Sequence, residues 1–328
     1  MSRTVLLAGL CLVLAAPAAL AQNVTGLEAV GQKAIDGSTQ TQDVAFRNDG
    51  YERMTVPVRL SDTGPYRFLV DTGADRTAIS RELAIRLKLP AGRGASLHTP
   101  AGISTVATAD VASLQLTRDR LKITDAALLD SAHMGADGIL GTDTLASQRI
   151  LFDFETQTMS IVPSAVRELT DDKDAIVVQA RRRNGRLIIS EARANNHRAT
   201  MVLDTGAQIS IGNPALRNKL FGSRKVNSAS QTQLVTVAGE AVLGELAYID
   251  RLEIGGVVLA HLAVVFTDTQ TFRTLKLDRK PAMLLGMNAM RAFKKISIDF
   301  AARKLRIVLP EHSALDVRLA AVRPKTRS

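Results

Sequence analysis

The stretch that decides the fold occurs twice, as Phe68-Leu69-Val70-Asp71-Thr72-Gly73-Ala74 and as Met201-Val202-Leu203-Asp204-Thr205-Gly206-Ala207. In each copy, three apolar residues typical of a buried strand lead into an aspartate, a hydroxyl residue and a glycine that permits a sharp turn. A buried carboxylate is unfavourable unless it is paired or hydrogen-bonded, but two that face each other can share a proton. The repeat therefore predicts that Asp71 and Asp204 meet in the interior.

The sequence around each copy repeats as well. Each is followed by a helix start, with Ser80 as the cap of a helix over 81–89 and Asn213 as the cap of a helix over 214–220. A hairpin tip comes next, and a hydrophobic-hydrophobic-glycine triplet then closes each half, at 139–141 and 284–286. This order indicates an internal duplication of one β-rich unit.

A third Asp-Thr-Gly, at 62–64, is a useful control for these motifs. Its aspartate follows Ser61 and its glycine precedes Pro65, which is the composition of an exposed turn between strands. The tripeptide alone is therefore weak evidence, and the apolar strand before the acid is what distinguishes the other two copies.

Six segments are expected along the chain. Arg3, an apolar run from Val5 to Ala16 and the small residues Ala19 and Ala21 are typical of a cleaved signal peptide, which predicts a periplasmic or secreted protein. Lipidation at Cys11 is disfavoured because Leu10 stands where a small residue is needed. The expected segments are a signal peptide (1–21), an N-terminal extension (22–50), an N-terminal lobe (51–163), a linker (164–174), a C-terminal lobe (175–310) and a basic tail (311–328).

Composition excludes several classes of protein. Cys11 is the only cysteine, and the five histidines show no metal-ligand spacing, so we expect no metal site and no cofactor. The net charge is +10, but the chain has no Trp and three Tyr and contains no nucleic-acid module, so we expect no nucleic-acid partner. After the first 21 residues no stretch is typical of a membrane span. We expect Arg181-Arg182-Arg183 to be solvated charges within a hairpin over 175–192, turned by Asn184-Gly185.

The two Asp-Thr-Gly-Ala motifs and the two closing triplets resemble the aspartic protease superfamily over about residues 52–309. The motifs are similar to the retroviral branch, and the single chain with both halves is similar to the pepsin arrangement. The resemblance implies an all-β fold with few short helices, in which two duplicated β-barrel-like lobes enclose a cleft. It also implies functional residues, namely the catalytic Asp71 and Asp204, the supporting Thr72, Gly73, Thr205 and Gly206, and the flap residues Ala101, Gly102, Ile103, Ala238 and Gly239.

The function implied is an aspartic endopeptidase that acts on extended protein or peptide substrates through a water held between two carboxylates. Which acid is protonated is a property of the pair and stays open. Because one chain carries both acids, a monomer suffices. The alternative is a catalytically silent peptide-binding module of the same fold. A phosphatase or metal hydrolase is disfavoured, because the sequence has no phosphate-binding glycine loop and no His-x-x-x-His pair.

Overall fold

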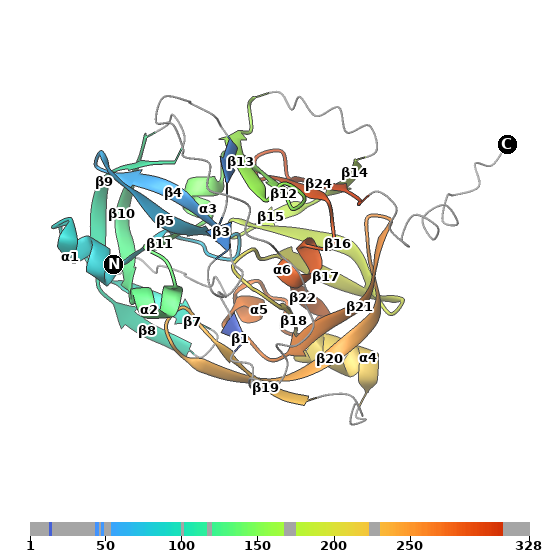
Figure 1. The fold of residues 1–328 in the computed structure, drawn as a ribbon. Helices are drawn as coiled ribbons and strands as arrows, with labels where there is room; N and C mark the ends of the chain where they lie inside the picture. Colours follow the sequence, from blue (N-terminus) through green and yellow to red (C-terminus); the bar gives the residue numbers. More distant parts are fainter. Residues whose placement is uncertain are drawn as a thin grey trace, which may run out of the picture.

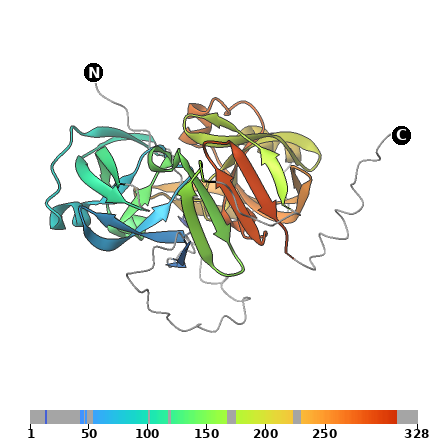
Figure 2. The same cartoon turned by 90° about the horizontal axis from the view of Figure 1, so that it is seen from above.

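The computed structural model describes residues 13–14, 43–45, 47–48, 54–99, 102–116, 120–166, 175–222 and 230–310. The described chain is mostly β-strand with six short helices, arranged as two lobes (Figures 1 and 2). Apart from residues 13–14, which are drawn in blue but join the sheet of the second lobe, the first lobe carries the blue to green segments and the second the yellow to red ones. The predicted all-β, bilobal fold is confirmed, whereas most of the signal peptide and the extension, and all of the tail, lie outside the described residues.

The first lobe is built on a seven-stranded sheet. Its order is β3 (Arg47–Asn48), β4 (Met54–Leu60), β5 (Thr63–Val70), β11 (Gly138–Leu140), β6 (Ala78–Ser80), β10 (Arg120–Leu129) and β9 (Thr108–Gln115). A further pairing of β4 with β9 curls the sheet into a barrel-like shape. The lobe also holds the hairpin β7 (Ala95–Thr99) and β8 (Gly102–Val106), and the helices α1 (Arg81–Arg86), α2 (Ser131–Met134) and α3 (Thr142–Leu145).

The second lobe repeats this plan with nine strands. Their order is β1 (Val13–Leu14), β19 (Ser230–Val235), β20 (Ala241–Ile254), β21 (Val257–Phe266), β18 (Ser210–Gly212), β22 (Ala282–Leu285), β17 (His197–Leu203), β16 (Arg186–Ala194) and β15 (Arg181–Arg183). Pairing of β20 with β16 again curls the sheet. The helices are α4 (Pro214–Phe221), α5 (Gln270–Thr274) and α6 (Met287–Met290).

A six-stranded sheet takes strands from both halves and joins them. Its order is β14 (Ile176–Gln179), β24 (Lys304–Val308), β23 (Lys295–Asp299), β12 (Gln148–Asp153), β13 (Thr158–Pro163) and β2 (Asp43–Ala45). Figure 2 shows it between the two lobes, and Figure 1 shows it on the opposite side of the molecule from β7, β8 and β19. The prediction of one hairpin over 175–192 is therefore wrong in part, because β14 pairs with β24 and only β15 and β16 form the hairpin.

The duplicated motifs fold alike because their local signals are alike. The strand before each acid pairs in parallel with the strand of the closing triplet, Leu69 with Ile139 and Val202 with Leu284. The side-chain oxygen of Ser80 caps α1 by accepting from the amide of Leu83, and Asn213 caps α4 in the same way. Both predicted helix starts are confirmed, although α1 ends at Arg86, three residues short of the prediction.

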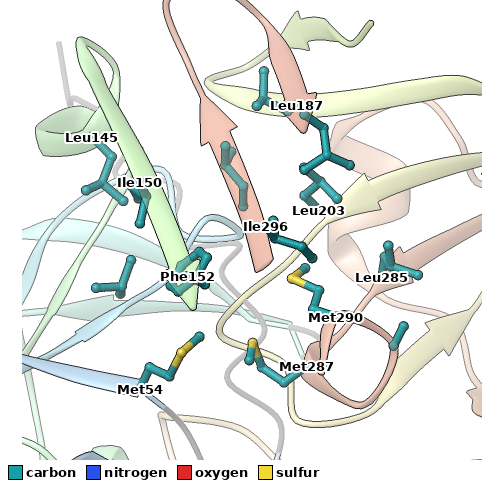
Figure 3. Close-up of a cluster of buried hydrophobic side chains, with 14 of the residues drawn as sticks. Met54, Leu145, Ile150, Phe152, Leu187, Leu203, Leu285, Met287, Met290 and Ile296 are labelled. Atoms are coloured by element: carbon teal, nitrogen blue, oxygen red, sulfur yellow. The ribbon is translucent and has the colours of Figure 1, made fainter. Parts of the chain in front are cut away.

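The main hydrophobic core crosses the boundary between the halves. Met54 and Phe152 from the first half lie in one cluster with Leu203, Met287 and Ile296 from the second (Figure 3). Burial stabilises by roughly 25 cal/mol per Å² of apolar surface, so separating the halves would expose a shared core. Within the described residues, no helix combines the length and the apolar character needed to cross a membrane.

Candidate active site

The two acids lie where each buried strand ends. Asp71 follows β5 and Asp204 follows β17, and both residues are 0% exposed. The amide of Asp71 donates to the carbonyl of Leu140 at 3.0 Å, and that of Asp204 donates to the carbonyl of Leu285 at 3.1 Å. The closing triplets therefore fix the backbone at the point where each chain leaves its sheet.

The two threonines join the acid loops across the lobes. The hydroxyl of Thr72 donates to the carbonyl of Leu203 at 3.0 Å and accepts from the amide of Thr205 at 3.0 Å. The hydroxyl of Thr205 donates to the carbonyl of Val70 at 2.7 Å and accepts from the amide of Thr72 at 3.1 Å. Because all four bonds are buried and reciprocal, neither loop can shift without leaving polar groups of the other unpaired.

The two glycines show how close the loops come. A Cβ atom built on Gly73 would lie 2.5 Å from Oδ1 of Asp204, and one on Gly206 would lie 2.4 Å from Cγ of Asp71. Each glycine thus packs directly against the carboxyl group of the opposite lobe. Both acids therefore face the same small space at the lobe interface, as the repeat predicts.

Backbone amides also bind the carboxyl groups. The amides of Gly73 and Ala74 donate to Oδ1 of Asp71 at 2.8 and 3.0 Å. The amides of Gly206 and Ala207 donate to Oδ1 of Asp204 at 3.1 and 3.2 Å. Such donors stabilise the ionised form of a carboxyl group, so the site can hold a negative charge.

Burial raises the pKa of Asp204 well above its usual range, and the negative charge of Asp71 raises it further. Arg186 and the two amides act in the opposite direction. Oδ2 of Asp204 is buried and has no hydrogen-bond partner among the described residues. Because ionising both acids would place two charges together in the interior, the pair favours a state with one shared proton.

Arg186 is a polar residue of the site that the sequence analysis did not identify. Its side chain is 0% exposed, and its Nε and Nη2 donate to the carbonyl oxygen of Gly73 at 2.8 and 2.5 Å. Nη1 lies 2.9 Å from Oδ1 of Asp75, although the two atoms are not aligned as a hydrogen bond. The available signal was its position directly before Leu187-Ile188-Ile189, where it begins a buried strand.

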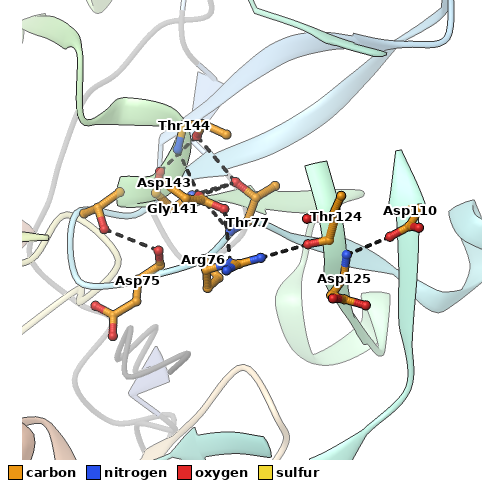
Figure 4. A network of polar contacts seen from close by, with 10 residues as sticks. Asp75, Arg76, Thr77, Asp110, Thr124, Asp125, Gly141, Asp143 and Thr144 are labelled. Atoms are coloured by element: carbon orange, nitrogen blue, oxygen red, sulfur yellow. Dashed lines mark hydrogen bonds and ion pairs between the residues drawn. The ribbon is translucent and has the colours of Figure 1, made fainter. Parts of the chain in front are cut away.

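Two further carboxyl groups flank the loop of the first lobe. Burial raises the pKa of Asp75 to about 6, while the positive charge of Arg186 lowers it and the charges of Asp71 and Asp143 raise it. Asp143 accepts from the amide and the hydroxyl of Thr77 at 2.9 and 2.8 Å (Figure 4). In the second lobe Asn288 takes the equivalent place and accepts from Ser210, so the extra negative charge belongs to the first lobe alone.

The two predicted flaps are hairpins with different surroundings. In the first, β7 pairs with β8 from Thr99 and Gly102 onward, Ile103 is 64% exposed, and Ala101 lies outside the described residues. The tip of the second, residues 236–240, joins β19 to β20 and contains Ala238 and Gly239. Both hairpins are therefore present at the predicted positions in the chain.

The tip of the second hairpin reaches the first lobe. Val237 is 3% exposed and lies in one buried cluster with Leu97 and Met134. A Cβ atom built on Gly239, whose φ is +82°, would lie 2.5 Å from Cε1 of His133. The hairpin therefore docks on α2 and β7 of the opposite lobe, which the sequence analysis did not predict.

Within the described part of the chain, no group of three or more His, Cys, Asp or Glu residues is placed to hold a metal ion. The polar atoms around the two acids are instead backbone amides, two threonine hydroxyls and the guanidinium group of Arg186, with the carboxyl group of Asp75 beside it. Two β lobes that contribute one buried carboxyl group each, joined by reciprocal threonine bonds, define a bilobal protein of the aspartic protease class.

Comparison with protein families leads to the same class. Residues 56–147 match a family described as "gag-polyprotein putative aspartyl protease", and residues 190–289 match one described as "Aspartyl protease". Together the matches span more than half of the chain and include both acid loops. The chain therefore belongs to the aspartic protease superfamily.

No curated protein matches the chain. Among solved structures, it is similar to a retropepsin-like aspartic protease from Rickettsia conorii, with 21% sequence identity over 40% of this chain and 88% of that one and a TM-score of 0.29.

Proposed function

We propose that the protein is an aspartic endopeptidase in which Asp71 and Asp204 activate one water molecule between them. The observation that carries this proposal is the contact of each acid loop with the opposite acid, through Gly73 against Asp204 and Gly206 against Asp71. Membership of the protease superfamily supports peptide hydrolysis as the reaction. A substrate bound as an extended strand would be positioned by backbone hydrogen bonds along the hairpins.

The reaction starts from the singly protonated pair. The ionised carboxylate accepts a proton from the water while the water oxygen bonds to the peptide carbonyl carbon, and the protonated carboxyl donates its proton to the carbonyl oxygen. The carboxyl that took the proton of the water then donates it to the nitrogen as the C–N bond of the resulting diol breaks. One hydroxyl of the diol gives its proton to the other carboxylate as the new C=O bond forms, so the pair again holds one proton in its starting arrangement. Thr72 and Thr205 hold the two loops, and the amides at 73–74 and 206–207 hold the negative charge.

The residue after each glycine of the acid loops affects the pH at which the proposed enzyme would work. Ala74 and Ala207 follow the two glycines where a hydroxyl residue would offer the acids one more hydrogen bond. Without that bond the ionised pair is less stabilised, so activity should extend to milder pH than in relatives adapted to strong acid. A pH-rate profile confined to very low pH would contradict this expectation.

A binding module without turnover is the second candidate. It is favoured by one observation, the complete burial of both acids together with the docked tip at Val237. For an enzyme, the hairpins have to move to admit substrate. The two candidates therefore differ in whether peptide bonds are cut, and not in the ligand.

Digestion of casein by the wild type, Asp71→Asn and Asp204→Asn tests the proposal. We expect both variants to lose at least about a thousandfold in rate, because a carboxamide neither accepts the proton of the water nor carries the charge. Asp62→Asn, in the exposed Asp-Thr-Gly turn, is the matched control and should retain wild-type activity. Binding of peptide with no cleavage by the wild type would favour the binding module.

Export and a monomeric state belong to the same proposal. We propose that residues 1–21 direct the chain across a membrane and are removed, which places the enzyme in the periplasm or outside the cell. The mass of the N-terminal peptide of the exported protein would show whether cleavage follows Ala21. Both acids come from one chain, so a monomer should be active. The specific activity should therefore not change with protein concentration in the range where sedimentation shows a monomer.

A further inference from the structure

Arg186 is among the largest fully buried side chains of the described structure, and it crosses from one lobe to the other. It begins β16 directly after the turn at Asn184-Gly185. That turn packs on the first lobe, since a Cβ atom on Gly185 would lie 2.5 Å from Oγ1 of Thr142. The neighbouring Arg181, Arg182 and Arg183 are exposed, so contact with the first lobe distinguishes Arg186 from them.

Arg186 is connected to both acids through Gly73. Two of its N–H groups donate to the carbonyl oxygen of Gly73. The amide of Gly73 donates to Asp71, and its Cα atom packs against the carboxyl group of Asp204. A cation fixed on this carbonyl therefore binds the Gly73–Ala74 peptide unit, whose Ala74 amide donates to Asp71. Consistent with this, the charge of Arg186 lowers the pKa of Asp204 against the effect of burial.

The charges around this site are few. The carboxyl group of Asp75 lies beside Arg186, and Gly73 separates Arg186 from the carboxyl groups of Asp71 and Asp204. The charge of Asp143 acts on Asp75. Arg76 pairs with Asp143 at 3.6 Å, and Arg182 lines, with Asp75, a pocket of about 410 Å³ at the edge of the lobe interface. Among these groups Arg186 is the fully buried cation, so its charge is screened least by water.

We propose that Arg186 is a positioning residue of the proposed reaction, which fixes the Gly73 peptide between the acids and maintains one negative charge on the pair. Asp75 sets the strength of this effect, because its carboxylate neutralises part of the guanidinium charge. The inference rests on the proposed function for its kinetic test, but it also makes a claim about protonation of the resting protein, which needs no turnover.

The experiment compares Arg186→Met, Arg186→Lys and Asp75→Asn with the wild type. An opposite charge within a few ångströms lowers a carboxyl pKa by about one to three units. In Arg186→Met both limbs of the pH profile of kcat/KM should therefore move up by about one unit or more. In Asp75→Asn the basic limb should move down, because Asp75, whose pKa is about 6, is ionised at that pH and its replacement leaves the guanidinium charge without this neutralising partner. Arg186→Lys should keep the wild-type midpoint with a lower kcat.

Arg181→Gln is the matched control, because this exposed arginine lies on the same hairpin and pairs with Ile188 across it. It should leave both the midpoint and kcat unchanged. The pH profiles of Arg186→Met and Asp75→Asn should shift in opposite directions. If Arg186 had only a structural role, both variants would lose activity while the midpoint of the pH profile stayed unchanged. That outcome, or equal shifts for Arg186→Met and Arg181→Gln, would overturn the proposal.

Titration of the ¹³C-labelled aspartate carboxyl groups by NMR gives the second readout. The same opposite shifts should appear in the resting protein, with or without proteolysis. An inactive wild type with the expected shifts would contradict the proposed function and support the role of Arg186. An active wild type with unshifted carboxyl titrations would do the reverse. If Arg186→Met does not fold, Asp75→Asn and Arg186→Lys still decide between these outcomes.

Discussion

At the scale of single residues, Gly73 and Gly206 allow the two acid loops to come into contact because neither has a side chain. Neither has a positive φ, so both are needed for space and not for backbone conformation. The opposite carboxyl group occupies the position that a side chain would take. Both peptide units of Gly73 are bound as well: its amide donates to Asp71, and its carbonyl oxygen accepts from Arg186.

Gly73→Ala should abolish measurable proteolysis. The added Cβ atom would lie 2.5 Å from Oδ1 of Asp204, well inside van der Waals contact, so the loops must separate. We expect a loss of about 1–3 kcal/mol in the free energy of unfolding, as for other overpacked sites, measured by urea denaturation. Gly256→Ala is the control. Its Cβ atom would meet nothing within 4 Å, so the only unfavourable effect is backbone strain at a φ of +90°, and the variant should retain activity. A fully active Gly73→Ala enzyme would mean that the loops are not in contact in solution.

At the scale of elements, the two hairpins of this duplicated protein are not equivalent. The tip of the second is closed by hydrogen bonds to Thr236, whose hydroxyl accepts from the amides of Ala238 and Glu240. Its apolar end packs among side chains of the first lobe, while Ile103 of the first hairpin is exposed. The tip of the second hairpin therefore joins the two lobes, and the proposed reaction would require its release before substrate could enter.

Val237→Ser should weaken the packing of the second hairpin tip against the first lobe. Replacing a buried valine with a hydroxyl residue removes about 1–3 kcal/mol of favourable burial at the tip. We expect the amides of residues 236–240 to exchange hydrogen at least about tenfold faster, and KM to change more than kcat. Leu243→Ser, in the same hairpin but 70% exposed, is the control and should exchange as the wild type does. Unchanged exchange in Val237→Ser would show that the tip is not docked in solution.

At the scale of the whole molecule, the buried acids make stability depend on pH. Burial raises the pKa of Asp75 to about 6 and that of Asp204 well above its usual range, so the folded state binds these protons more tightly than the unfolded chain. Their contribution is therefore present at low pH and is lost as pH rises. The pKa of Asp153 is lowered by hydrogen bonds and by Lys295, so its stabilising effect is lost only below about pH 4.

The free energy of unfolding should therefore fall between about pH 4 and pH 6. A pKa difference of about two units for Asp75 corresponds to about 3 kcal/mol. Urea denaturation at pH 4.5, 5.5 and 6.5 measures the slope, which should be smaller in Asp75→Asn and in Asp204→Asn. A stability that rises with pH across this range would contradict the raised pKa values.

Local patterns predicted much of this molecule. The strands that lead to Asp71 and Asp204, the caps at Ser80 and Asn213 and the exposed turn at 62–64 all follow from hydrophobic periodicity and turn chemistry. The same patterns misjudged the segment 175–192, because periodicity identifies a strand but not its partner. They correctly indicated that Arg181, Arg182 and Arg183 are exposed, but they gave no role to Arg186 on the same hairpin.

The sequence by itself determined that two similar units each carry an acid out of a buried strand, because burial and turn formation depend on residues close together in the chain. Only the tertiary structure decided what surrounds the acids: the shared six-stranded sheet, the docked tip at Val237 and the cation at Arg186. Those contacts join segments more than a hundred residues apart, such as Arg186 and Gly73. Their existence depends on how the two lobes pack, which no local pattern encodes.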